Sequence, residues 1–263
     1  MNQLQIIDQV RKIGIEDDKI SAILMYGSFT KGEGDQFSDV EFYVFLRKDC
    51  IIDKRGLLSS VLPVDMLFTN EFGTDVVIFE NLIRGEFHFH PVSEITTIRT
   101  WQGMLNFEVR DKMNLVDKDG LLTEVLNSIE NLRPEWNTPE NIIWVADSMI
   151  NHIIFVNNVI QRGEYVRAEH LFFFLQKYMA LLIRLHLNTT GHWLDPMKGF
   201  EKEIPAEWHK KYTNCIPGPG VNSLKKCLWN TILLTQELFS LLHVSEHDVL
   251  ILNKIITKLQ KVN

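Results

Sequence analysis

The sequence predicts two domains of different class, an α+β domain with a mixed sheet and flanking helices over residues 1–135 and an all-α helical bundle over residues 136–263. Before residue 135, short runs rich in β-branched and aromatic residues are separated by turn residues, which is typical of strands. After it, apolar residues recur at helical spacing over long segments. The length of 263 residues and the 45% hydrophobic content suffice for a full core and make two domains the natural expectation.

Strands dominate the expected elements of the first half. Each expected strand is either a short apolar run bounded by turns or an alternation of polar and apolar residues. The expected elements are a helix over residues 2–13, the strands Ala22–Tyr26, Asp39–Leu46, Asp75–Phe79 and Glu86–His90, and a helix over residues 120–131.

Start and stop signals divide the second half into helices. Thr138, followed by Pro139 and Glu140, predicts a helix start, and Gly163 predicts its end. The segment Ile216–Gly220 contains two prolines and two glycines and breaks the chain. Further helices are expected at Tyr165–Asn188, at Pro205–Asn214, at Ser223–Leu242, and from a capping box at Ser245 to Val262. Several antiparallel helices with short connections indicate a bundle.

A glycine turn after the first strand predicts a loop that binds an anion. Gly27 lets the backbone approach phosphate oxygens without a Cβ in the way, and the Ser28 hydroxyl can donate to them. Thr30 and Lys31 lie in the segment that wraps around the anion, so these four residues are the predicted nucleotide contacts. A Walker-type loop is excluded, because Glu33 stands where that motif requires lysine.

Asp39 and Glu41 form a pair of carboxylates on the second strand. Because side chains alternate along a strand, both point to one face while Val40 and Phe42 point into the core. Two adjacent carboxylates repel each other unless a cation lies between them, and magnesium fits that role. Asp-x-Glu by itself is common on solvated strands. With ten residues between it and the Gly27-Ser28 turn, however, the pair predicts a metal–nucleotide site with two magnesium ions held by Asp39 and Glu41.

A third carboxylate is expected from the strand at residues 86–90. Alternation places Glu86, His88 and His90 on one face. If that face also holds Asp39 and Glu41, Glu86 is positioned to accept a proton from an incoming hydroxyl, whereas the alternative is a surface-facing residue. His-x-His on a strand could bind zinc, but no third ligand lies at a suitable spacing. We therefore expect His88 and His90 to line the acceptor-binding cleft.

The helical half is expected to close a cleft and to shape an acceptor pocket. Lys177 and Arg184 are seven residues apart, two turns on one helical face, and Lys177 is a predicted phosphate contact. A solvated helix face is an equally good interpretation. Trp193 and Trp208 suit either an acceptor pocket or the helical core. The apolar run Phe172–Phe174 is compatible with a homodimer interface and with a well-packed bundle.

Composition argues against nucleic acid and membrane partners. The net charge of −7 argues against nucleic acid as the main partner, because proteins that neutralise many phosphates are normally basic. The three cysteines form no C-x-x-C motif, which favours a reducing cytoplasm. We expect neither a signal peptide nor a membrane span, since the longest apolar candidate, Leu171–Leu187, is broken by charged residues. The expected partners are small molecules in the cytoplasm.

Two segments, Met25–Phe42 and Val76–Phe89, resemble the two-domain lincosamide nucleotidyltransferases of the polymerase-β-like nucleotidyltransferase superfamily. The resemblance implies transfer of a nucleoside monophosphate, usually AMP from ATP, to a hydroxyl of lincomycin or clindamycin, which confers antibiotic resistance. It also implies that the acidic pair holds magnesium, that Glu86 is the general base, and that the Gly27 turn binds the triphosphate. A homodimer is common in this family.

Three alternative functions remain open from the sequence. One is an aminoglycoside nucleotidyltransferase with the same donor site and a more acidic acceptor pocket. Another is a nucleotidyltransferase that modifies a protein or a tRNA end. The third is a catalytically silent, antitoxin-like nucleotide-binding module, against which the complete set of Asp39, Glu41 and Glu86 argues.

Overall fold

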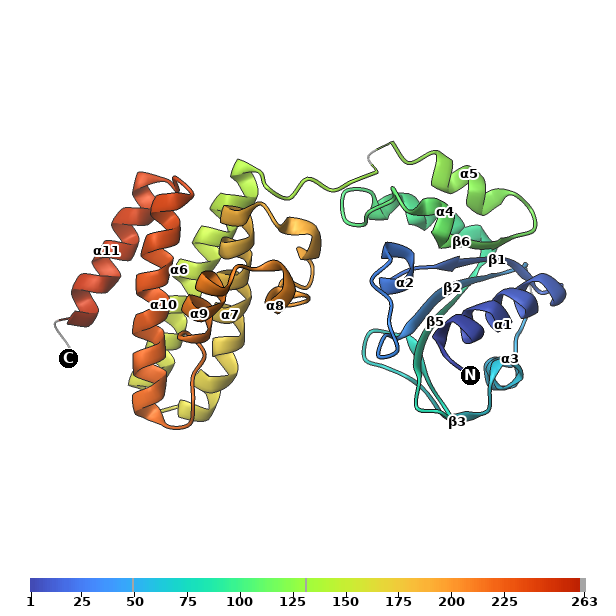
Figure 1. Ribbon diagram of the computed structural model, residues 1–263, viewed down its shortest axis with the longest axis horizontal. Coiled ribbons are helices and arrows are strands. Elements are labelled where there is room, and N and C mark those ends of the chain that lie inside the picture. The colour runs from blue at the N-terminus through green and yellow to red at the C-terminus, as the bar shows by residue number, and fades with distance from the viewer. Residues whose placement is uncertain (49, 131, 261–263) are drawn as a thin grey trace. The chain divides into compact units, whose positions relative to one another are not determined.

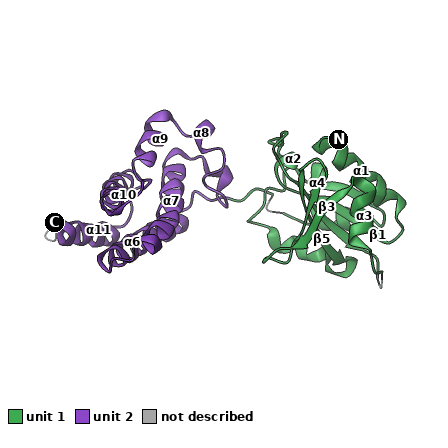
Figure 2. Ribbon diagram, turned by 90° about the horizontal axis from the view of Figure 1, so that it is seen from below, with its two compact units in different colours: residues 1–134 green, residues 135–263 purple. Residues whose placement is uncertain are grey.

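The structure is a computed structural model that describes residues 1–48, 50–130 and 132–260 (Figure 1). The chain forms two compact units, residues 1–134 and residues 135–263 (Figure 2). The first unit combines a mixed sheet with helices, and the second is helical. The predicted fold class, an α+β unit followed by a helical bundle, is confirmed.

A mixed sheet forms the centre of the first unit. Within the described residues it has six strands in the order β3-β4-β5-β2-β1-β6. The strands are β1 (Ile20–Met25), β2 (Val40–Leu46), β3 (Val64–Thr69), β4 (Asp75–Phe79), β5 (Arg84–Pro91) and β6 (Asn114–Asp117). β2 and β5 pair in parallel, and the other neighbouring strands pair antiparallel. The parallel register sets Glu41 directly beside Glu86.

Apolar side chains cover both faces of this sheet. On one face, helices α1 (Gln3–Glu16) and α3 (Lys54–Val61) pack against strand residues that include Phe42 and Phe87. On the other face, the 3-10 helix η1 (Val92–Trp101) and helix α5 (Leu121–Asn127) pack against residues that include Leu24 and Phe45. Side chains alternate along β2, so Glu41 and Tyr43 point to the same face as Phe45. Glu41 therefore lies on the second face.

The first unit contains elements that local sequence pattern does not reveal. β3 is mostly exposed and β6 has four residues, so neither shows the buried apolar run that predicts a strand. The short helices α2 (Ser28–Lys31) and α4 (Arg110–Met113) and the elements α3 and η1 are also additional. The helix expected at residues 120–131 is shorter, and residue 131 lies outside the described residues.

Long helices pack around one apolar core in the second unit. The elements are α6 (Pro139–Gln161), α7 (Tyr165–Leu187), η2 (Thr190–His192), α8 (Phe200–Glu203), α9 (Ala206–Thr213), α10 (Val221–Leu241) and α11 (Glu246–Gln260). Thr138 caps α6 as predicted, and Ser245 accepts a hydrogen bond from the Asp248 amide at the start of α11. Figure 1 shows α6, α7 and α10 running alongside one another. The predicted end of the last helix, Val262, lies outside the described residues.

By length and composition, α6 is able to cross a membrane. The sequence predicts this helix but not its ability to span a membrane, since the longest apolar candidate in the sequence is Leu171–Leu187. In the structure, Val145, Met149 and Ile153 of α6 are fully buried in the core of the second unit. Burial covers 39% of the apolar stretch, and the core helix of a soluble protein can have the same length and composition.

Arg184 is fully buried on α7 and fixes the chain that follows this helix. Its Nε donates to the carbonyl of Pro196 at 2.7 Å. One terminal nitrogen donates to the carbonyl of Thr189 at 2.9 Å and to the carboxylate of Glu203 at 2.6 Å. The other donates to the carbonyl of Lys198 at 2.6 Å. A buried guanidinium is tolerated when its donors are paired in this way.

We expect Arg184→Met to lower the free energy of unfolding of the second unit by about 3 kcal/mol, because it leaves buried carbonyls without donors. The matched control is Arg167→Met on the same helix, since Arg167 is exposed and pairs with Glu164 at the surface. The control should cost no more than about 1 kcal/mol. Urea denaturation followed by tryptophan fluorescence measures both, because Trp101 is the only tryptophan of the sequence before residue 135. Equal losses would contradict the assignment of Arg184 as a structural anchor.

Candidate active site

Gly27 forms the turn that connects β1 to α2. Its φ of 80° and ψ of −151° are readily adopted by glycine and rarely by other residues. A Cβ on Gly27 would lie 1.5 Å from Oε2 of Glu41, so the Glu41 carboxylate rests against the bare Cα. The Tyr26 amide also donates to the Glu41 carbonyl at 3.1 Å. The glycine turn and the acidic strand therefore form one local structure.

The residues after Gly27 differ in how far their side chains are exposed to solvent. The Thr30 hydroxyl donates to the carbonyl of Gly27 at 2.8 Å and is buried, so it stabilises the turn. Ser28 is also buried, and its carbonyl accepts the Glu33 amide at 3.0 Å. Lys31 is exposed at the end of α2. Phosphate binding by Gly27, Ser28, Thr30 and Lys31 stays a prediction.

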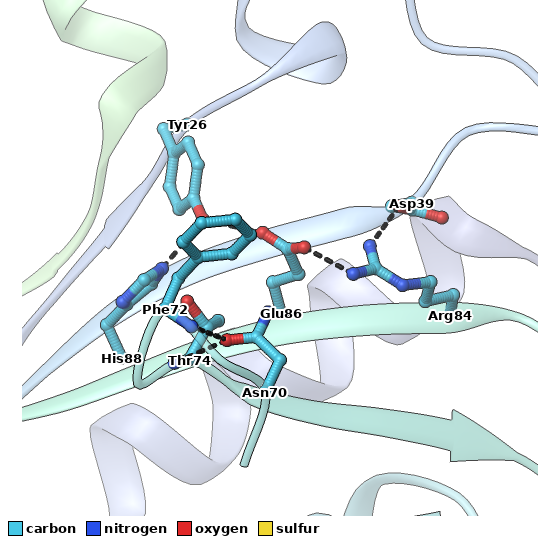
Figure 3. Close-up of polar contacts among 8 residues, drawn as sticks. All are labelled: Tyr26, Asp39, Asn70, Phe72, Thr74, Arg84, Glu86 and His88. Atoms are coloured by element: carbon cyan, nitrogen blue, oxygen red, sulfur yellow. Dashed lines mark hydrogen bonds and ion pairs between the residues drawn. The ribbon is translucent and has the colours of Figure 1, made fainter. Parts of the chain in front are cut away.

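The structure brings the three predicted carboxylates together. Glu41 of β2 and Glu86 of β5 are lateral partners in the parallel pair, and Asp39 immediately precedes β2. Asp39 and Glu86 are linked through one shared partner (Figure 3). Asp39 and this shared partner are 45 residues apart in the sequence. The site thus joins two distant segments of the chain.

That shared partner is Arg84, a residue that sequence reasoning missed. One terminal nitrogen donates to Oδ2 of Asp39, and the other donates to Oε1 of Glu86. Although partial burial lowers the pKa of Arg84, hydrogen bonds and charge from Glu86 and Asp39 raise it overall, so the guanidinium stays charged. A signal was present in the sequence, because Arg84 precedes Glu86 by two residues and strand alternation puts both on one face.

Tyr26 links Glu86 to His88. Its hydroxyl lies 3.3 Å from Oε2 of Glu86, to which it donates, and 3.0 Å from Nε2 of His88. Burial raises the pKa of Tyr26 strongly, and the charges of Glu41 and Glu86 raise it further. The phenol therefore keeps its proton and remains a hydrogen-bond donor to the carboxylate.

Aromatic rings extend from this network along the same face. The ring of Tyr43 stacks on His88 with centroids 4.2 Å apart and an 8° angle between the planes, and Trp101 lies 4.8 Å from Tyr43. Burial lowers the pKa of His88, although the nearby Glu86 charge acts in the opposite direction. The lowered pKa keeps the imidazole neutral. His90 instead pairs with Glu94 at 2.8 Å near the surface. The two predicted acceptor contacts thus have different surroundings, and their acceptor role stays a prediction.

The chemistry of the carboxylate set fits a cation. Hard oxygen ligands suit magnesium, and Asp39 and Glu86 already hold a cationic group in common. Across residues 1–48, 50–130 and 132–260, no group of three or more His, Cys, Asp or Glu side chains is arranged to hold a metal ion. Magnesium binding by Asp39 and Glu41 therefore stays a prediction.

Lys177, the predicted phosphate contact in the second unit, has a partly exposed side chain. Its ammonium lies 6.0 Å from the ring centroid of Tyr178. Arg184 does not share this exposure, because its donors are used inside the core. Trp193 and Trp208 are buried in the core as well, which favours their core interpretation over an acceptor pocket. Contact between Lys177 and a nucleotide stays a prediction.

Comparison with known proteins gives a family match to the helical unit and similar solved structures for the chain. Residues 138–262 match the family described as "Lincosamide nucleotidyltransferase-like, C-terminal domain". An aminoglycoside 6-adenyltransferase from Bacillus subtilis gives a TM-score of 0.44 at 13% identity, over 99% of this chain and 98% of that chain. A nucleotidyltransferase-like protein from Exiguobacterium sibiricum 255-15 gives a TM-score of 0.39 at 15% identity, over 88% of this chain and 74% of that chain. No curated protein sequence matches the chain.

We expect Gly27→Ala to destabilise the first unit by more than the roughly 1–2 kcal/mol that a positive φ costs an alanine, because the new methyl overlaps the Glu41 carboxylate. Gly73→Ala is the matched control, since Gly73 has a φ of 79° and no atom within 4 Å of a built Cβ. Thermal unfolding by circular dichroism measures both. The double variant Gly27→Ala/Glu41→Ala should recover the difference, and equal effects of the two single variants would exclude a close approach of Glu41.

Proposed function

We propose, because residues 138–262 match the model of the lincosamide nucleotidyltransferase-like C-terminal domain, that this chain is an antibiotic-modifying nucleotidyltransferase that transfers AMP from ATP to a hydroxyl of a lincosamide. In this proposal, residues 1–135 form the catalytic domain and residues 136–263 bind the acceptor. The substrate class is taken from the name of the family. The reaction class rests on the first unit.

The observation that carries the proposal is the convergence of three carboxylates beside a glycine turn. Glu41 and Glu86 are neighbours on parallel strands, Asp39 shares Arg84 with Glu86, and Gly27 lies against Glu41. Phosphoryl transfer needs little covalent chemistry from a protein and depends on positioned charge. A rigid acidic set on two adjacent strands supplies such positioning.

Glu86 is the proposed general base. It accepts the proton of the acceptor hydroxyl as that oxygen attacks the α-phosphorus of the nucleotide. A bond forms between the hydroxyl oxygen and the α-phosphorus, and the bond from that phosphorus to the bridging oxygen breaks, so pyrophosphate leaves with the electron pair. Tyr26 donates to Oε2 of Glu86 and holds this carboxylate in place. Its raised pKa keeps Tyr26 protonated throughout.

Magnesium is the proposed cofactor, with Asp39 and Glu41 as the residues that would hold it. When bound, it neutralises charge on the triphosphate and on the pyrophosphate leaving group. Gly27, Ser28, Thr30 and Lys31 are proposed to contact the phosphates, with Lys177 of the second unit as an additional contact.

We further propose a cytoplasmic location and small-molecule partners. All three cysteines of the sequence are unpaired, which is the usual state in a reducing compartment. The acidic net charge of −7 suits a weakly cationic antibiotic better than a nucleic acid. A homodimer is a further proposal drawn from the family resemblance.

Acceptor choice is tested with purified protein, ATP, magnesium and a panel of antibiotics. We expect lincomycin and clindamycin to gain the mass of one AMP, while kanamycin stays unmodified. Mass spectrometry of the acceptors measures this directly. Modification of kanamycin with inert lincosamides would instead assign the chain to aminoglycosides, the alternative acceptor class. Modification of neither class would favour a protein or tRNA acceptor or a silent nucleotide-binding module.

Separate roles are expected for Glu86 and Asp39. Glu86→Gln should lower kcat by about 10²–10⁴-fold, because an amide cannot accept the hydroxyl proton, while binding of magnesium–ATP survives. Asp39→Asn should abolish turnover and weaken binding of magnesium–ATP. Glu16→Gln, an exposed change on α1 at the other face of the sheet, is the control and should keep its activity. Steady-state kinetics and calorimetry on one preparation measure both quantities. Loss of nucleotide binding in Glu86→Gln as complete as in Asp39→Asn would make Glu86 a metal ligand instead.

A further inference from the structure

The positively charged group of Arg84 lies between the carboxylates of Asp39 and Glu86. Its two terminal nitrogens donate to different residues, one to Asp39 and the other to Glu86. The three side chains are partly exposed, with 36% for Arg84, 39% for Asp39 and 22% for Glu86. The guanidinium therefore bridges two carboxylates (Figure 3) and is itself partly exposed.

This contact opposes both roles that the proposed function gives to the carboxylates. Oδ2 of Asp39 accepts from a cation that repels a divalent metal ion approaching the same group. Oε1 of Glu86 accepts from a permanently charged guanidinium, which lowers the affinity of this oxygen for the proton of an acceptor hydroxyl. The contacts of Arg84 therefore compete with both proposed roles.

Arginine is also well suited to a second partner. Its planar fork matches phosphate oxygens in a bidentate manner. A metal–triphosphate complex that enters the site brings a cation for the carboxylates and an anion for the guanidinium. Arg84 can then exchange its two carboxylate partners for phosphate oxygens without losing charge-assisted hydrogen bonds.

Resting on the proposed function, we infer that Arg84 is an exchange residue. It holds Asp39 and Glu86 when no nucleotide is bound, and it moves to the donor phosphates when the metal–triphosphate complex binds. Metal alone must displace Arg84 without offering it a new partner. Metal and triphosphate offer that partner together, so each strengthens the binding of the other. The apparent affinity for metal alone is reduced by the fraction of molecules in which Arg84 is bound to the carboxylates.

The test measures Mn²⁺ binding to the nucleotide-free protein by the electron paramagnetic resonance signal of free Mn²⁺. We expect Arg84→Gln to bind Mn²⁺ alone about tenfold more tightly than the unmodified protein, since it lacks the competing charge-assisted hydrogen bonds. The matched control is Arg47→Gln. Arg47 has 43% exposure and pairs with Asp119 at 2.9 Å in the same unit. Its substitution should leave Mn²⁺ binding unchanged.

The second measurement is the coupling between metal and nucleotide. Calorimetry with α,β-methylene-ATP, with and without Mn²⁺, gives the factor by which the metal strengthens nucleotide binding. This factor should fall about tenfold in Arg84→Gln, because the exchange is removed. It should stay unchanged in Arg47→Gln.

Three outcomes overturn the inference. Unchanged or weaker Mn²⁺ binding in Arg84→Gln would show that Arg84 does not compete with metal, although the proposed function would stand if the unmodified protein binds Mn²⁺ with the analogue. Failure of the unmodified protein to bind Mn²⁺ and analogue together would overturn the proposed function as well. If Arg84→Gln does not fold, Arg84→Lys replaces it. Because lysine lacks the fork that bridges both carboxylates, Mn²⁺ alone should again bind more tightly, and no change would count against exchange.

Discussion

Repulsion between carboxylates on adjacent strands is the constraint on which the first unit depends. Glu41 and Glu86 are lateral partners on β2 and β5, and Asp39 lies one residue before β2. Like charges placed opposite each other on paired strands are unfavourable. Arg84 offsets this repulsion from the same strand and the same face as Glu86. The site is therefore built to hold positive charge.

Rigid elements surround this charge cluster. Gly27 lets the Glu41 carboxylate lie against the backbone, and Thr30 fixes the turn by donating to the Gly27 carbonyl. Tyr26 connects the end of β1 to Glu86 and His88 on β5. The stacked ring of Tyr43 adds β2 to the same network. Contacts from three neighbouring strands thus surround Glu86, while Arg84 and Asp39 at the edge of this network are the more exposed members.

The second unit also contains an arginine that pairs with a carboxylate, but this arginine is buried. Arg184 is fully buried, and its donors meet three carbonyls and the carboxylate of Glu203. Such a closed set of partners leaves no role for an incoming anion, so this arginine is structural. Arg84 has two side-chain partners and access to solvent. Exposure and partner type, rather than residue type, distinguish an anchor from a residue that can exchange partners.

The sequence by itself determined the features that depend on neighbours along the chain. Strand alternation placed Glu86 and His88 on one face, the cap at Thr138 started α6, and the glycine turn preceded the acidic pair. These features follow from local geometry and can be read from spacing. The exposed edge strand β3 was missed because its pattern carries no buried run.

Only the tertiary structure decided which of these features meet. The parallel register that sets Glu41 beside Glu86, and the contact of Arg84 with Asp39 across 45 residues, depend on pairing between distant segments. The burial of Arg184 likewise depends on the course of the chain after α7. Many registers are compatible with one local pattern, and packing against two cores selects one of them. The residue types were therefore visible in the sequence, whereas their ion pairs were fixed by the fold.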